Sequence, residues 1–199
     1  MRLATLLLCL LLAPPLIAQD AAPDAATNGA PRVRVLTNAG SFVIELDKAR
    51  APLTVEAFLK YVKDGFYSGV VFHRVVAGFI AQAGGYTADM QQKPVTSAVF
   101  NESGNGLSNL RGTVGFARSN EPHSGTSQFY INLADNIDLN PRPTRWGYAV
   151  FGKVVEGMEV VDDIGHRPTA GGGEFDRNVP VEPIVIERIE LIEPPSKGP

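Results

Sequence analysis

Apolar residues recur at every second position in short stretches along most of the chain. Val33 and Val35 alternate with arginines, and after a turn at 38–40 the residues from Phe42 to Leu46 alternate in the same way. Such alternation puts the apolar side chains on one face of a strand, so two strands around a short turn predict a β-hairpin. Further short strands are predicted at 70–76, 79–83, 113–117, 128–133, 148–155 and 184–192.

Two stretches have helical periodicity instead. Pro52 suits the first turn of a helix, apolar residues from Val55 to Val62 are three and four positions apart, and Gly65 suits the end. A second helix is predicted at 156–164. Many short strands with two helices, and no regular alternation between them, favour a mainly antiparallel β-barrel or sandwich over a doubly wound sheet.

The first residues have the pattern of a secretory signal peptide. Arg2 is followed by an apolar run at 3–12, a Pro14-Pro15 break and the small residue Ala18. The run is too short to span a bilayer. A buried N-terminal helix is the alternative, but the two prolines and the polar stretch after them disfavour it. We expect cleavage after Ala18, or a few positions later because Leu16 is not the small residue preferred there.

These boundaries predict one folded domain in an exported protein. Residues 1–18 form the signal peptide, 19–31 a flexible lead-in rich in Ala, Asp and Pro, 32–193 the domain and 194–199 a loose tail. The leader predicts a periplasmic location, with no membrane insertion after cleavage. We expect a monomer, because neither an unpaired apolar helix nor a heptad seam is visible.

Composition and charge exclude several classes of function. The 199 residues carry a net charge of −3 without a basic cluster, which disfavours a nucleic-acid partner. The single cysteine, Cys9, lies in the predicted leader, so the mature chain lacks a thiol nucleophile and disulfides. His73, His123 and His166 have no partner at metal-ligand spacing, and no serine lies in a nucleophile-elbow motif. We therefore expect an activity that needs no metal and no cofactor.

Two stretches carry polar residues in unusual places. Arg74 lies among valines in the predicted strand at 70–76, and a desolvated guanidinium needs a partner or a task. Strand alternation puts Ile80 and Gln82 on one face, while Tyr130 lies with two amides on the polar face of 128–133. These faces could line a peptide groove. From periodicity alone an exposed strand face is the favoured explanation for Arg74, and an ordinary half-solvated strand explains the 128–133 pattern equally well.

Several segments, in order, resemble the cyclophilin family. FHRVVAGFIAQ at 72–82 is similar to the family signature, and SQFY at 127–130 and YAVFGKV at 148–154 resemble two further segments. Residues 86–93, 109–118 and 126–136 are similar to the bacterial periplasmic cyclophilins. The resemblance covers about 33–191, nearly the whole predicted domain.

The resemblance implies a fold, an activity and a site. The fold would be a closed eight-stranded antiparallel β-barrel capped by two α-helices, and the activity peptidyl-prolyl cis/trans isomerisation of unfolded or partly folded exported polypeptides. The implied catalytic residues are Arg74, Phe79 and Gln82. The implied substrate-binding residues are Ile80, Ala117, Arg118, Tyr130, Leu139 and Tyr148.

Some positions depart from the family pattern. Tyr130 replaces the usual pocket phenylalanine and adds a hydroxyl at or near the proline ring. Asp138 stands where the family has tryptophan or another aromatic, at a position associated with cyclosporin binding. The departure at Tyr130 keeps a second function open, a non-catalytic chaperone that holds proline segments on the same fold. Retention of Arg74, Phe79 and Gln82 together favours the enzyme.

Overall fold

A computed structural model describes residues 29–192 of the chain. The predicted signal peptide, most of the lead-in and the predicted tail lie outside the described residues. Within 29–192, no helix is both long and apolar enough to cross a bilayer.

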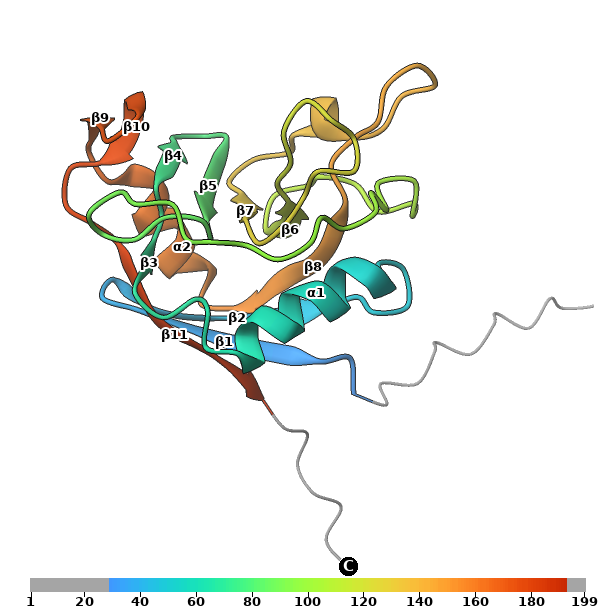
Figure 1. The fold of residues 1–199 in the computed structure, drawn as a ribbon, viewed down its shortest axis with the longest axis horizontal. Coiled ribbons are helices and arrows are strands. Elements are labelled where there is room, and N and C mark those ends of the chain that lie inside the picture. Colours follow the sequence, from blue (N-terminus) through green and yellow to red (C-terminus); the bar gives the residue numbers. More distant parts are fainter. Residues whose placement is uncertain (1–28, 193–199) are drawn as a thin grey trace, which may run out of the picture.

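An antiparallel sheet of nine strands dominates the described residues (Figure 1). Its hydrogen-bonding order is β3-β11-β1-β2-β8-β6-β7-β5-β4. The strands are β1 (Arg32–Thr37), β2 (Gly40–Leu46), β3 (Val70–Val71), β4 (Arg74–Val76), β5 (Ile80–Ala83), β6 (Thr113–Phe116), β7 (Phe129–Asn132), β8 (Val150–Glu156) and β11 (Val185–Ile192). The mainly β, antiparallel fold predicted from alternation is therefore confirmed.

The two edges of this sheet belong to one stretch of chain. β3 pairs with β11 and β4 pairs with β5, yet only Phe72 and His73 separate β3 from β4. The single strand predicted at 70–76 is therefore two strands. The sheet curls so that its two edge strands, β3 and β4, follow each other in the chain. They are joined through Phe72 and His73 and not by strand pairing. Counted as one bent strand, β3 and β4 reduce the nine strands to the eight that the resemblance implied.

Two helices and a second hairpin complete the described fold. Helix α1 (Pro52–Lys63) buries Val55, Phe58 and Val62, as its periodicity predicts, and the Phe58 ring lies 5.5 Å from that of Phe129 and 5.2 Å from that of Phe151. Helix α2 (Met158–His166) contacts β2, β4 and β5. The glycines at 171–173 belong to a hairpin of β9 (Thr169–Gly172) and β10 (Phe175–Pro180), which the strand pattern does not predict.

Side-chain alternation divides the sheet into an inner and an outer face. Val75, Ala81, Phe129 and Ile131 belong to the buried apolar core between the sheet and α1. Their neighbours along β4, β5 and β7 project from the opposite face. Polar side chains on these strands are therefore held on the outer face, above a packed core.

His73 lies at the break between β3 and β4 and is almost completely buried. Its ring lies 4.6 Å from that of Tyr86 and 5.5 Å from that of Phe175 in β10. Burial lowers the pKa of His73 from 6.5 to about 4, and the small effects of Arg74 and Glu174 oppose each other. The folded protein therefore holds this imidazole neutral across the physiological range.

We expect the burial of His73 to make stability depend on pH. Its folded-state pKa is below that of the unfolded chain, so the unfolded chain binds a proton in the mildly acidic range that the folded chain does not. The free energy of unfolding should fall by about 2 kcal/mol between about pH 7.5 and about pH 5, measured by urea unfolding. The neutral, buried His73 makes its full contribution to the free energy of unfolding above pH 6.5, and this contribution is lost as the pH falls towards 4.

His73→Phe, which keeps a ring between Tyr86 and Phe175, should show a pH dependence smaller by the same amount. The exposed His166→Phe is the control and should retain the wild-type dependence. If the free energy of unfolding of His73→Phe depended on pH as strongly as that of the wild type, the loss of stability in acid would come from the carboxylates and not from His73.

Candidate active site

Four residues on neighbouring strands form a straight row across the sheet. Arg74 on β4 is the register partner of Gln82 on β5, Gln82 is opposite Tyr130 on β7, and Tyr130 is opposite Gly115 on β6. Directly opposite residues project from the same face of a sheet, with Cβ atoms about 5 Å apart. The register therefore brings together Arg74, Gln82 and Tyr130, which sequence analysis placed on separate strands.

The guanidinium of Arg74 is held by an amide pair. Its Nη1 donates to Gln82 Oε1 at 3.2 Å, and Gln82 Nε2 donates to Gln128 Oε1 at 2.9 Å. Arg74 is half-buried, and burial lowers its pKa from the ordinary value, although a guanidinium still keeps its charge in a protein. Among the described residues, none of the ion pairs includes Arg74. Its charge is therefore positioned without being neutralised.

Tyr130 lies over the backbone of β6 because Gly115 leaves room for its ring. A Cβ on Gly115 would lie 2.2 Å from Tyr130 Cζ, so any larger residue there would force the ring to move. The Tyr130 hydroxyl donates to Asn109 Oδ1 at 2.6 Å, and burial raises its pKa well above 10. The hydroxyl expected at or near the proline ring is therefore bonded inside the protein.

Asn109 connects Tyr130 to the loops that cover this face. It is completely buried, donates to Asn140 Oδ1 at 3.0 Å and also accepts from Asn132 Nδ2 at 3.2 Å. Asn136 extends the network, donating to Asn132 Oδ1 and to the carbonyl of Phe79, both at 2.8 Å. These amides fix the loops on either side of the Tyr130 ring.

Tyr148 and Arg118 extend the row away from Arg74. The Tyr148 ring lies 6.0 Å from that of Tyr130 at a nearly perpendicular angle, and the Arg118 guanidinium lies over the Tyr148 ring at 4.4 Å. Arg118 Nε also donates to the carbonyl of Gly147 at 3.1 Å. The backbone N–H of the half-buried Ala117 donates to the carbonyl of Gln128 at 2.9 Å.

The remaining site residues are placed through the backbone. Ile80 is buried on β5, on the same face as Gln82. Leu139 is half-buried in the short 3-10 helix η1 (Ile137–Leu139), and its carbonyl accepts from Tyr148 N at 2.9 Å. Phe79 is half-buried in the turn before β5, and its backbone carbonyl accepts from Asn136 Nδ2 at 2.8 Å and from Leu133 N at 2.9 Å.

Three residues that shape this site are not among those predicted from the sequence. Gln128 was noted on the polar face of its strand but was not assigned to the site, although its amide orients Gln82. Gly115 and Asn109 lie in the matching segment 109–118, but the sequence assigns neither of them a role, because their roles depend on which strand and loop lie beside Tyr130. The described residues contain no cluster of three or more His, Cys, Asp or Glu side chains that could hold a metal ion.

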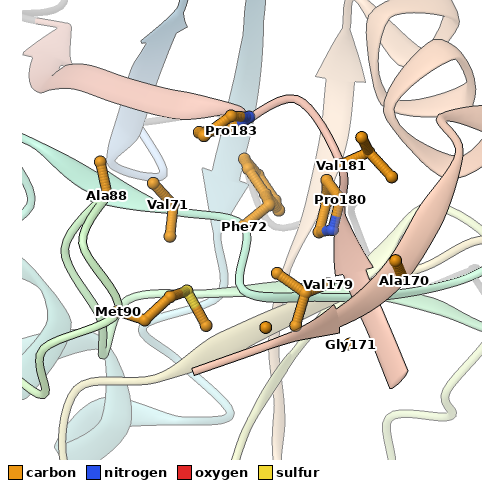
Figure 2. A pocket seen from close by; sticks show the side chains of 11 residues that line it. Val71, Phe72, Ala88, Met90, Ala170, Gly171, Val179, Pro180, Val181 and Pro183 are labelled. Carbon is orange, nitrogen blue, oxygen red and sulfur yellow. The ribbon is translucent and has the colours of Figure 1, made fainter. Parts of the chain in front are cut away.

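A separate apolar hollow lies between β3, the β9–β10 hairpin and the loop that carries Met90 (Figure 2). Its volume is about 270 Å³, and the side chains around it include Phe72, Met90, Val179 and Pro183. It contains none of the predicted site residues, and its lining side chains carry no charge. The row on the outer face is therefore the better candidate for chemistry.

Comparison with known proteins gives consistent matches. Residues 32–191 match the family described as cyclophilin type peptidyl-prolyl cis-trans isomerase/CLD. Peptidyl-prolyl cis-trans isomerase A of Dickeya dadantii is 47% identical over 171 residues, 86% of this chain and 90% of the relative. Peptidyl-prolyl cis-trans isomerase B of Escherichia coli is 44% identical over 160 residues, 79% of this chain and 97% of the relative.

Solved structures agree with these relatives. The crystal structure of a cyclophilin type peptidyl-prolyl cis-trans isomerase from Cryptosporidium parvum has a TM-score of 0.68 at 25% identity, covering 83% of this chain and 99% of that one. A second structure of that protein, in the presence of the dipeptide Ala-Pro, has a TM-score of 0.67.

We expect removal of the Tyr130 hydroxyl and removal of the Asn109 side chain to lower the free energy of unfolding by different amounts. Tyr130→Phe should lower the free energy of unfolding by about 1 kcal/mol, because Asn109 Oδ1 keeps its bond from Asn132. Asn109→Ala should cost about 3 kcal/mol, because it leaves the buried Tyr130 hydroxyl without a partner and also removes the bonds to Asn132 and Asn140 from a completely buried position. Urea unfolding measures both, with Asn120→Ala, at an exposed position, as the control. Equal costs for the two variants would contradict this account of the network.

Proposed function

The chain belongs to the cyclophilin family of peptidyl-prolyl cis-trans isomerases, and we propose on that premise that Arg74 is its catalytic residue. The activity is rotation about the peptide bond before proline, and proline-containing peptides are the substrates. The observation that carries the assignment is a half-buried guanidinium held by Gln82 without a carboxylate partner among the described residues.

The chemistry of the amide explains why such a group is useful. The proline nitrogen donates its lone pair to the carbonyl, which gives a rotation barrier of roughly 18–20 kcal/mol. Rotation through the twisted state returns the lone pair to a pyramidal nitrogen. A fixed N–H donor can bond to that nitrogen only in the twisted state, so it stabilises the transition state more than either planar isomer. Arg74 is such a donor, because Gln82 uses only one of its N–H groups in the described structure.

The other site residues hold the two sides of the rotating bond. We assign the proline ring to the apolar surface made by Phe79, Ile80, Tyr130 and Leu139, with Tyr148 at its edge. Gln82, oriented by Gln128, steadies the substrate carbonyl. Ala117 and Arg118 line the groove along the peptide backbone. No covalent bond is formed or broken in this mechanism.

The departure at Tyr130 gives no support to a non-catalytic chaperone. Its hydroxyl bonds to Asn109, so the face of the ring remains an apolar wall like that of phenylalanine. Family membership supports turnover of the bound segment.

The location and the clients follow from the predicted leader. The positive Arg2, the apolar run at 3–12 and the small residue Ala18 support export to a periplasm. The clients would then be exported polypeptides that fold there, bound by a monomer.

We expect Arg74→Ala to remain folded and to lose activity by about 100-fold, the size expected when a fixed transition-state donor is removed. Arg74→Lys should recover little, because an ammonium lacks the planar, spread donors of a guanidinium. A protease-coupled assay on a short Ala-Pro peptide measures both variants. Arg34→Ala, at an exposed position on β1, is the matched control and should retain full activity. Near wild-type turnover by folded Arg74→Ala would contradict the assignment and leave family membership untouched.

We expect the full-length chain, expressed in a Gram-negative bacterium, to be recovered from the periplasm with Gln19 as its first residue. Cell fractionation followed by N-terminal sequencing measures this. Deletion of 3–12 should keep the chain in the cytoplasm with an uncleaved N-terminus. Cytoplasmic recovery of the uncleaved wild-type chain would contradict export.

A further inference from the structure

Three aromatic side chains from three separate loops pack together on the surface beside the candidate site. The rings of Phe100 and His123 stack with centroids 4.2 Å apart and planes at 14°. Trp146 meets both edge-on, with its centroid 5.0 Å from that of His123 and 6.3 Å from that of Phe100. We call Phe100, His123 and Trp146 the aromatic clasp.

The clasp is exposed although two of its members are large and apolar. Phe100 is 57% exposed and Trp146 is 44% exposed. Single exposed apolar residues are common on protein surfaces, but a contiguous aromatic group indicates an interaction site. The stacked rings leave apolar surface free for a further side chain.

A single buried amide holds the three loops that carry the clasp. Asn101 follows Phe100 in the chain, and its Nδ2 donates to the carbonyls of Pro122 and Gly147, both at 3.0 Å. Pro122 precedes His123, and Gly147 follows Trp146. The backbone N–H of Asn101 also donates to His123 Nδ1 at 3.1 Å. Each of the three rings therefore belongs to a residue next to Asn101 or next to a residue that Asn101 binds. Because these bonds lie within the protein, the clasp is formed before any ligand binds.

The clasp is continuous with the groove through Arg118. Arg118 Nη2 donates to the carbonyl of Trp146 at 2.8 Å, while the same guanidinium lies over the Tyr148 ring. Trp146 and Tyr148 are two positions apart in the chain, and two residues of extended chain span about 7 Å. The clasp therefore lies within a few residues of a bound peptide from Tyr148 and the apolar wall beside it. A substrate bound at the wall can therefore reach the clasp.

We propose that the aromatic clasp is an accessory substrate site, which binds an aromatic or aliphatic side chain a few residues from the proline. The inference rests on the proposed function of the groove. Unfolded polypeptides expose such side chains, and flat rings bind them with little demand on sequence. The clasp would thus favour unfolded clients over isolated X-Pro dipeptides and would act on KM.

Two peptides test this. A tetrapeptide with a central Ala-Pro is too short to reach the clasp and is the reference substrate. A ten-residue peptide with the same centre carries phenylalanine two to four positions from the proline on both sides. For the wild type we expect the ratio of kcat/KM, long over short, to be about fivefold, the size of one aromatic contact. Phe100→Ser should reduce this ratio to about one, mainly through KM. The control Leu191→Ser, also exposed but on β11, should keep it.

Trp146 provides an independent readout because it is the single tryptophan of the chain. Its emission should change when the long peptide binds, and not with a long peptide in which alanine replaces every phenylalanine. Arg74→Ala should show the same emission change, because it removes a catalytic group and leaves the clasp intact. This separates the two ideas, since turnover of Arg74→Ala tests the proposed function and emission tests the clasp.

Two results would overturn the inference. One is a long-to-short ratio that stays fivefold in Phe100→Ser. The other is a wild-type dimer in sedimentation that Phe100→Ser converts to a monomer, which would make the clasp an interface between two copies of the chain.

Discussion

Side-chain alternation along three short strands is the constraint on which the rest of the structure depends. Each of β4, β5 and β7 sends one set of residues into the core and the other to the outer face. Val75, Ala81 and Phe129 are thus fixed by packing, and Arg74, Gln82 and Tyr130 are fixed by the same backbone. A shift of one residue in any of these pairings would exchange core and site.

Loop amides give the outer face its shape. Asn109 ties Tyr130 to the covering loops, and Asn101 ties together the three loops that carry the aromatic clasp. Both side chains are buried, and both satisfy groups that would otherwise lie unpaired away from water. Loops that are held in place by such bonds can keep their apolar side chains exposed to a substrate, because the bonds prevent the loops from folding over those side chains. This explains how long loops of a small domain can form a pre-organised surface.

A pre-organised surface suits a reaction in which only a bond rotates. Such a rotation is accelerated by groups that are already aimed at the twisted amide. Arg74 remains charged and is oriented by Gln82, and Gln82 is oriented by Gln128. Little reorganisation is then needed when the substrate rotates.

The amino-acid sequence by itself determined most strands of the large sheet, both helices and the unusual position of Arg74, because these depend on local periodicity and on the cost of burying a charge. The motifs at 72–82 and 127–130 also indicated the family. Only the tertiary structure decided that Arg74, Gln82 and Tyr130 form one row and that the strand predicted at 70–76 is interrupted at His73. It also decided that Asn109 and Gly115 position Tyr130 in the site. These features depend on strand register and loop contacts between residues far apart in the chain, and periodicity along the chain contains no information about either.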